Sequence, residues 1–187
     1  MEDTTRVQRI ASYREQSRLA DALDEAGEMA RALEALEAYR AEAHRAGDED
    51  YARYFAAEIA LLASDDFPAA RSHNRDGMAW REAHGLPPDA FLMRAQGLYC
   101  RLADDDGEAL RWYDAALQAD PGDAPAWFGK GLVLLDEDAY RGAIECFNQA
   151  LALHPGDSDA WREQAVAWTF LDNDAAAIEG FDKALAL

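Results

Sequence analysis

The feature that most constrains the fold is a set of aromatic and small residues that recurs every 34 positions in the second half of the chain. The spacing needs no gap, and an earlier copy of the set lies one period upstream. A fixed period of this length is typical of stacked helical hairpins, in which each unit buries its apolar face against its neighbours. The recurring pairs are Trp127 and Trp161, Gly131 and Ala165, Ala143 and Ala177, Phe147 and Phe181, Ala150 and Ala184, and Leu151 and Leu185, and the upstream copy holds Gly97, Ala109, Tyr113, Ala116 and Pro121, the last matching Pro155.

This pattern resembles the tetratricopeptide repeat, most clearly over residues 89–187. The resemblance implies an all-α fold, a right-handed α-solenoid of about five antiparallel helix hairpins in a single domain, residues 1–187. Three regular units follow two diverged ones. The expected units span about 4–47, 48–88, 89–122, 123–156 and 157–187. The expected helices span about 4–25, 28–43, 51–64, 67–84, 90–103, 108–119, 124–136, 140–154, 158–171 and 175–187.

Acidic residues predict where several helices begin. A carboxylate just before a helix accepts a hydrogen bond from an unpaired backbone N–H and meets the positive end of the helix dipole. Acidic runs at residues 104–106 and 172–174 could also suggest calcium loops, but the glycine that such a loop needs is misplaced or missing. We therefore predict capping and no metal site. The residues expected to cap first helices are Asp50, Asp89, Asp123 and Asp157.

The first two hairpins fit the repeat less well. Ala32 and Ala70 match a small-residue column, and Leu36 fits the aromatic column, but Asn74 does not. Glu58 falls where the regular units have a glycine. Either the register slips there or the two helices stand farther apart.

Other prominent side chains are interpreted as structural. Lys130 stands where the family usually has leucine, and its stem can cover apolar surface while the ammonium reaches water. Cys100 and Cys146 lie on apolar stripes and are expected to be buried. Five tryptophans fall at helical spacing and are expected to pack rather than to hold a ligand: Trp80, Trp112, Trp127, Trp161 and Trp168.

Composition excludes several classes of partner. The formal net charge of −19 disfavours nucleic acid and anionic membranes, since both bind basic surfaces. The chain has no apolar run long enough for a membrane helix, and its polar start is not a secretory signal. Two cysteines suit a reducing compartment. We predict a cytoplasmic protein.

Motifs for catalysis are absent from the sequence. It has no glycine-rich phosphate loop and no nucleophile elbow. The histidines show no spacing that would let them share a metal ion: His44, His73, His84 and His154. We predict no enzymatic activity and no cofactor.

The resemblance implies that the first helix of each unit lines a concave groove, which holds an extended peptide or a partner helix. Three arginines in the matching set could pair with a carboxylate on the ligand, and the middle of the set is apolar. Alternatively, the leucines simply pack inside a tight superhelix. The predicted partner is a neutral, basic or amphipathic protein or peptide. The groove residues are Phe55, Ile59, Leu62, Arg94, Leu98, Arg101, Phe128, Leu132, Leu135, Arg162, Val166 and Thr169.

One branch of the family is disfavoured. Members that hold chaperone C-termini use a clamp of Lys, Asn and Arg over three first helices. Only one of the matching positions is basic, and two are acidic: Arg94, Leu98, Gly129, Asp159 and Glu163.

The alternative function is a self-associating structural module, or a piece of a longer array, that stacks through its last unit. Repeat arrays normally finish with a polar helix that covers the final apolar face, and none follows the fifth unit. Trp168, Ile178 and Leu185 are then expected to be exposed or covered by a second copy as a homodimer.

Overall fold

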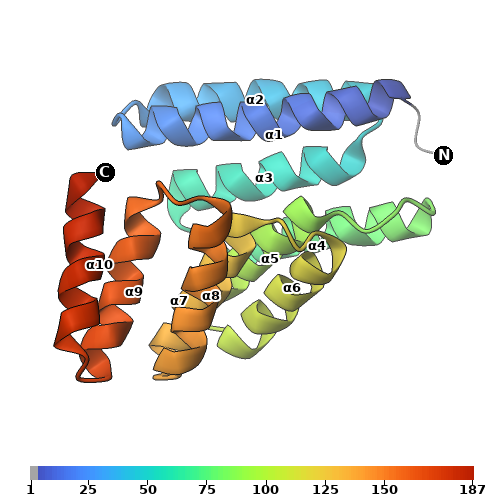
Figure 1. Ribbon diagram of the computed structural model, residues 1–187. Helices are drawn as coiled ribbons and strands as arrows, with labels where there is room; N and C mark the ends of the chain where they lie inside the picture. Colours follow the sequence, from blue (N-terminus) through green and yellow to red (C-terminus); the bar gives the residue numbers. More distant parts are fainter. Residues whose placement is uncertain (1–3) are drawn as a thin grey trace. The chain divides into compact units, whose positions relative to one another are not determined.

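The computed structural model describes residues 4–187, except for the side chain of Glu25, and this range is all-α. Successive helices pair into five hairpins, α1 with α2 through α9 with α10 (Figure 1). The predicted all-α hairpin repeat is confirmed. The helices are α1 (Thr4–Glu25), α2 (Met29–Ala46), α3 (Glu49–Ser64), α4 (Phe67–Ala83), α5 (Ala90–Leu102), α6 (Asp106–Ala119), α7 (Ala124–Asp136), α8 (Tyr140–Leu153), α9 (Ser158–Phe170) and α10 (Asp174–Ala186).

The chain forms two compact units, residues 1–88 and residues 89–187. We call them the N-terminal unit and the C-terminal unit. The boundary follows Pro87 and Pro88, which cannot continue a helix, and Asp89 then caps α5 by accepting hydrogen bonds from the N–H groups of Phe91 and Leu92. The single solenoid domain over residues 1–187 stays a prediction.

The C-terminal unit follows the 34-residue columns. Ala109, Ala143 and Ala165 are fully buried, as the repeat pattern predicts. The small residues at the equivalent positions of the first helices are predicted to face the alanines of the second helices, Gly97 facing Ala109 and Gly131 facing Ala143. Instead, a Cβ added to Gly97 or to Gly131 would meet an aromatic ring of the paired helix, at 3.0 Å from Tyr113 and 2.6 Å from Phe147 respectively. The glycines therefore make room for the aromatic column.

The turns within the last four hairpins place an aspartate in the left-handed conformation, at Asp65, Asp104, Asp138 and Asp172, where the first hairpin has Gly27. In the regular units the next N–H returns to a carbonyl five residues earlier, as Asp105 N–H does to Cys100, which closes the helix end. Asp105 and Asn173 then cap α6 and α10 with their side chains. The predicted caps Asp123 and Asp157 are confirmed on α7 and α9.

The prediction for Asp50 was wrong. Helix α3 begins at Glu49, so Asp48 occupies the N-cap position and Asp50 lies inside the first turn, fully buried. Asp48 makes no side-chain cap either. Both carboxylates turn toward arginines of other helices, because a buried charge gains more from a charged partner than from a backbone N–H.

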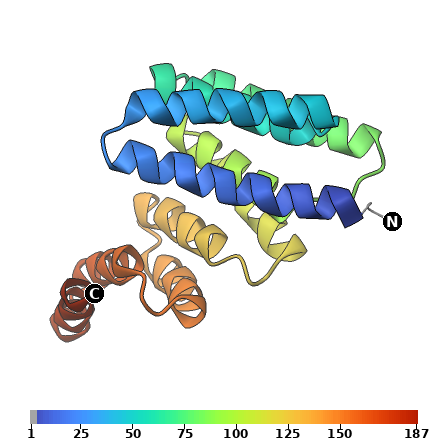
Figure 2. The same cartoon turned by 90° about the horizontal axis from the view of Figure 1, so that it is seen from above.

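The N-terminal unit has longer helices and a different core. Figure 2 shows α1 and α2 as the long pair, of 22 and 18 residues, against 13 to 14 in each helix of the regular units. Its core is a cluster of aromatic rings with centroids 5.4 to 6.3 Å apart. The rings belong to Tyr13, Tyr39, Tyr51, Tyr54 and Phe55.

Glu58 stands where the regular units have a glycine, and the structure shows why. The closest approach of α3 and α4 lies at another position along the two helices. A Cβ on Gly77 of α4 would lie 2.7 Å from the backbone oxygen of Asp50. The two helices therefore do approach closely, but the glycine that permits it is on the second helix and nearer the start of α3. Of the two explanations, the slipped register is the one observed.

Candidate functional site

The first helices of the C-terminal unit form one side of the repeat stack. Helix α7 contacts both α5 and α9, whereas within this unit the second helices α6, α8 and α10 make at most marginal contact with one another. In a curved stack, the elements on the inner side approach most closely. We therefore define the inner face as the predicted residues on these helices, all of them half-buried or exposed: Arg94, Leu98, Arg101, Phe128, Leu132, Leu135, Arg162, Val166 and Thr169.

The centre of the inner face is apolar. Leu98, Leu132 and Val166 occupy the same repeat position on α5, α7 and α9, and each is half-buried. We call these three residues the apolar strip. Phe128 also packs partly inward, with its ring centroid 5.8 Å from that of Phe147 on α8. The strip thus has an apolar floor and remains accessible to a partner.

The arginines of the inner face already have acidic partners. Arg94 Nε lies 3.2 Å from Asp123 Oδ2, and Arg101 Nη1 lies 3.9 Å from Asp136 Oδ2, so both pairs connect α5 to α7. Arg162 pairs with Glu163 at 2.9 Å on its own helix. Pairing of these arginines with a ligand carboxylate stays a prediction, and it would have to displace these partners.

A chaperone-type clamp does not fit this face. A Cβ on Gly129 would lie 2.5 Å from the ring of Tyr113. A side chain as long as those of the clamp would therefore clash with this ring. Tyr113 fills the space between Gly97 and Gly129, and burial raises its pKa to about 12. Gly129, one of the positions matched to the clamp, is thus used for packing between helices.

The predicted groove residues of the N-terminal unit differ in exposure. Phe55 is fully buried and packs against Tyr13 and Tyr39, so its assignment to a partner-binding groove was wrong. Ile59 and Leu62 are half-buried. Leu62 lines a hollow of about 300 Å³ bounded by α1, α2 and α3.

The sequence did not reveal a buried charge network in the N-terminal unit. Asp50 accepts hydrogen bonds from Arg6 of α1 at 2.8 and 2.9 Å and from Arg81 of α4 at 2.6 Å. Asp48 accepts from Arg6 at 3.0 Å and from Arg9 at 2.8 Å. Two buried carboxylates therefore join three helices.

Tyr13 completes this network from α1. Its hydroxyl donates to Asp48 Oδ2 at 3.1 Å, and burial, together with the nearby Asp48 charge, raises its pKa to about 12. The partners lie 31 to 44 residues apart in the chain, so no local pattern could have indicated them.

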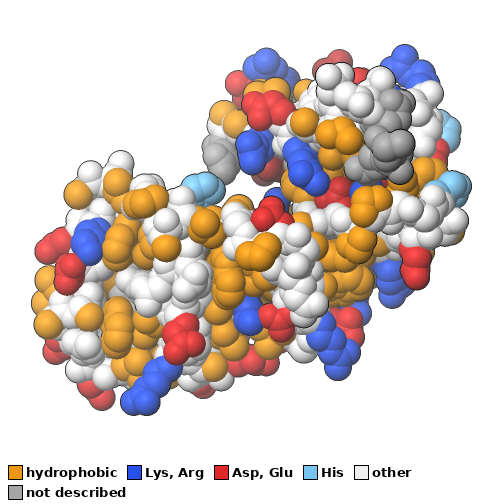
Figure 3. Space-filling view, turned by 45° about the vertical axis from the view of Figure 1, so that its right-hand side comes forward, with side chains coloured by type: hydrophobic (Ala, Val, Ile, Leu, Met, Phe, Trp, Pro, Cys, Tyr) orange, Lys and Arg blue, Asp and Glu red, His pale blue; other side chains and the backbone are white. Residues whose placement is uncertain are grey.

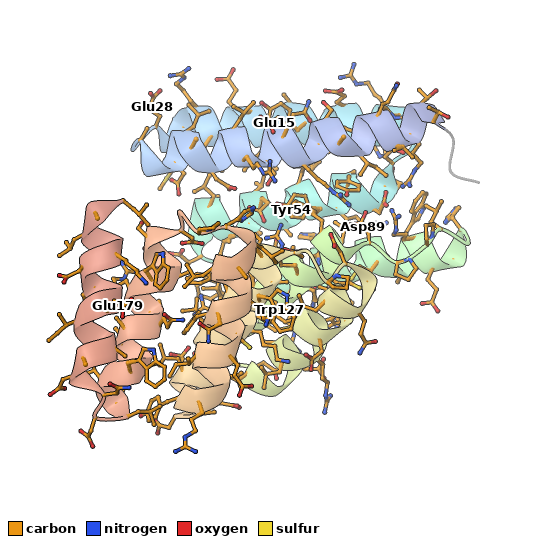
Figure 4. All side chains as sticks on the ribbon, viewed as in Figure 1. Glu15, Glu28, Tyr54, Asp89, Trp127 and Glu179 are labelled. Atoms are coloured by element: carbon orange, nitrogen blue, oxygen red, sulfur yellow. The ribbon has the colours of Figure 1, made fainter. Side chains whose placement is uncertain are left out.

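Two tryptophans fix the turns between repeats. The indole N–H of Trp127 donates to the carbonyl of Pro121 at 3.1 Å, and Trp161 repeats the bond to Pro155 at 2.9 Å. Figure 4 labels Trp127 on α7. The structural interpretation of these two residues is supported.

Lys130 and Gln164 connect consecutive repeats. Lys130 Nζ donates to Asp114 of α6 at 2.6 Å, and one period later Gln164 Nε2 donates to Asn148 of α8 at 2.8 Å. Both bonds span 16 residues, so they form a periodic pair that sequence comparison of the repeats could have found.

The residues predicted for self-association separate into two groups. Ile178 and Leu185 of α10 are 61% and 86% exposed. Trp168 is half-buried and lines a hollow with Ile144 of α8 and Leu171. Only the first two belong to an exposed apolar face of α10.

Other classes of site find no support in the described part of the chain. Residues 4–187 contain no group of three or more His, Cys, Asp or Glu side chains placed to hold a metal ion. None of the helices in that range combines the length and the apolarity needed to cross a bilayer. Both cysteines are buried, and burial raises the pKa of Cys146 to about 11. On the face seen in Figure 3, hydrophobic side chains lie among scattered charges of both signs.

The hairpins and their 34-residue columns define a helical repeat fold, and comparisons with known proteins show which repeats it resembles. The family model of the tetratricopeptide repeat matches residues 124–157. One repeat of the chain therefore matches the tetratricopeptide repeat model, and the fold of residues 4–187 is the one seen in tetratricopeptide repeat structures. A search of curated proteins found no match.

Solved structures share this fold at low identity. YrrB, described as a tetratricopeptide repeat protein with an unusual peptide-binding site, is 20% identical, with a TM-score of 0.61 over 91% of this chain and 84% of its own. MamA from Desulfovibrio magneticus RS-1 is 20% identical, with a TM-score of 0.66 over 94% of each chain. The second repeat domain of Spaghetti (RPAP3), bound to an HSP90 peptide, is 23% identical, with a TM-score of 0.52 over 52% of this chain and 91% of its own.

Proposed function

We propose that the C-terminal unit binds a peptide or helix of a partner protein across the inner face of α5, α7 and α9. The chain acts in this proposal as a non-catalytic scaffold in the cytoplasm. The observation that carries it is the apolar strip, Leu98, Leu132 and Val166, which presents one half-buried aliphatic side chain from each of three adjacent helices. Contiguous accessible apolar surface on a protein commonly marks a binding site.

The charges around the strip indicate the chemistry of the partner. Arg94, Arg101 and Arg162 are neutralised by carboxylates of this chain, so an acidic ligand would have to displace those partners. The net charge of −19 also repels an acidic ligand and attracts a basic one over long range. The partner is therefore a neutral, basic or amphipathic segment that inserts apolar side chains into the strip.

Relatives in fold support binding of this kind. YrrB is described as having an unusual peptide-binding site, and the Spaghetti domain is bound to an HSP90 peptide. Tyr113 occupies the space above Gly129, which argues for apolar contact rather than for capture of a terminal carboxylate.

The test is affinity capture with the wild-type chain, a Leu132→Glu variant and a Leu153→Glu control. Leu153 lies on α8, away from the inner face, and is 41% exposed, so the control adds the same charge elsewhere in the same unit. Circular dichroism checks that all three chains are folded. Partners that are retained by the control and lost from Leu132→Glu support the proposal, and partners retained equally by all three contradict it.

A further inference from the structure

The apolar face of α10 is the counterpart of a face that α8 buries. Identical residues stand one period apart on the two helices, and their exposure changes from 5% to 61% between Ile144 and Ile178 and from 6% to 86% between Leu151 and Leu185. Phe181 is likewise 37% exposed where its equivalent is fully buried. Helix α9 covers α8, whereas within residues 89–187 only α9 makes substantial contact with α10, and it does so as the other half of the same hairpin. The packing of α8 therefore shows what kind of element fits α10.

A polar pair accompanies each of the covered interfaces. Asp114 on α6 accepts from Lys130 on α7, and Asn148 on α8 accepts from Gln164 on α9. The next acceptor in this 34-residue series is Asp182, which is exposed on α10. An ionised aspartate only accepts hydrogen bonds, so the element that covers α10 must present a donor.

The helices that cover α6 and α8 share a second feature. Small or short aliphatic residues flank the donor four positions before it and three positions after it, on the same helix face. They are Ala126 and Val133 around Lys130, and Ala160 and Ala167 around Gln164, and all four are fully buried. Their small size lets the aromatic and branched side chains of the second helix pack closely.

We propose that the exposed face of α10 docks a helix of a partner protein that presents a lysine or arginine to Asp182. The partner helix has alanine or valine four residues before that cation and three residues after it. These small residues pack against Ile178, Phe181 and Leu185 of α10. Because Asp182 repeats the carboxylate of Asp114, which takes a lysine, a cation fits it better than the glutamine that pairs with Asn148. This site is separate from the inner face and does not depend on the proposed function.

A second copy of α10 is a poor occupant of the same face. The helix carries Asp174, Glu179 and Asp182 against a single cation, Lys183. Lys183 is already engaged, because its Nζ lies 2.8 Å from Glu179 Oε1 and 4.2 Å from the ring centroid of Trp161 (Glu179 is labelled in Figure 4). Two copies face to face would therefore bring like charges together without a free lysine to offset them.

The test uses a fluorescein-labelled peptide of residues 157–173 in which Gln164 is replaced by Lys, added to the full chain and followed by anisotropy. This peptide carries the small–cation–small pattern of a covering helix. Saturable binding is expected, weakened at least about 10-fold by Ile178→Glu, which places a charge in the apolar contact. Val7→Glu is the matched control, because Val7 is also exposed, at 48%, but lies in the N-terminal unit, and it should leave the affinity unchanged.

A charge exchange tests the pair itself. A second peptide with Glu in place of Gln164 should bind the wild-type chain about 5-fold more weakly than the lysine peptide, and Asp182→Lys should reverse that order. Equal affinities for the two peptides would overturn the pairing with Asp182. The absence of saturable binding would overturn the docking site, and so would loss of binding in Leu132→Glu but not in Ile178→Glu. Concentration-dependent dimerisation that Ile178→Glu abolishes, measured by sedimentation equilibrium, would assign the face to a second copy and also overturn the proposal.

Discussion

The two units of this protein are stabilised in different ways. The C-terminal unit repeats the same contact, in which an aromatic ring of the second helix fits against a glycine of the first, as Tyr113 does against Gly97 and Phe147 against Gly131. The N-terminal unit uses a network that occurs once, in which Asp48 and Asp50 join arginines of α1 and α4. Periodic contacts suit extension by further units, whereas a unique network specifies one arrangement of particular helices.

The stability of the N-terminal unit therefore depends on charge pairing, and that of the C-terminal unit depends on the fit of side chains. Breaking a buried ion pair leaves a charge without compensation, and this costs more than most changes in packing. Overfilling a glycine contact costs less, because neighbouring side chains can shift. The following substitutions test that order.

The largest expected effect is at Asp50. Asp50→Ala leaves Arg6 and Arg81 without their shared carboxylate, and we expect a loss of about 3–5 kcal/mol in the free energy of unfolding. Urea unfolding followed by circular dichroism measures it. Asp76→Ala, at an exposed aspartate of α4, is the matched control and should change stability by less than about 0.5 kcal/mol. A loss below about 1 kcal/mol at Asp50 would refute the importance of the network.

The next effect separates two glycines of the C-terminal unit. Gly129→Ala places a Cβ 2.5 Å from the Tyr113 ring and should cost about 1–3 kcal/mol. Gly107→Ala adds a methyl group in open space on α6 and should stabilise the protein by about 0.5–1 kcal/mol. Thermal unfolding of both variants gives the sign of each change. Equal shifts would show that close packing does not require Gly129.

A pH titration compares the buried tyrosines of the two units. Burial raises the pKa of Tyr13 and of Tyr113 to about 12, above the usual value of 10.0, so the folded protein keeps protons that the unfolded chain loses. Their contribution to stability is complete below about pH 10 and is lost as the pH rises toward about 12. Tyr113→Phe should flatten this alkaline loss in urea unfolding measured at increasing pH. If the free energy of unfolding of Tyr113→Phe falls with pH as steeply as that of the wild type, the raised pKa of Tyr113 is contradicted.

The smallest expected effect is at the turns between repeats. Trp127→Phe removes the bond from the indole N–H to Pro121 and should cost about 0.5–1.5 kcal/mol, as should Trp161→Phe at the equivalent bond. Similar losses, read from urea midpoints, would show that the two repeats use this bond alike. If neither variant changes stability, the two indole hydrogen bonds do not stabilise the turns.

Much of the C-terminal unit could be predicted from sequence because its signals are local or periodic. Asp89, Asp123 and Asp157 cap helices through bonds to residues two or three positions away. The buried columns recur at a fixed period, so Ala143 and Phe147 were identifiable as core positions.

The misses share a physical cause, since each involves residues far apart in the chain. The sequence predicts Asp50 to be a helix cap, but its carboxylate accepts hydrogen bonds from Arg6 and Arg81, which are 44 and 31 residues away. Phe55 has the spacing of a groove residue, but rings of α1 and α2 bury it. The sequence likewise did not reveal the partners of Arg94 and Arg101, because Asp123 and Asp136 lie on the next repeat.

Hydrogen–deuterium exchange of the full chain, with and without a partner captured as described above, tests the central claim most directly. Binding across the inner face should protect amides of α5, α7 and α9 around Leu98, Leu132 and Val166. The Leu132→Glu variant should lose that protection, and the Leu153→Glu control should keep it. Protection confined to the N-terminal unit or to α10 would contradict the assignment of the inner face as the partner-binding site.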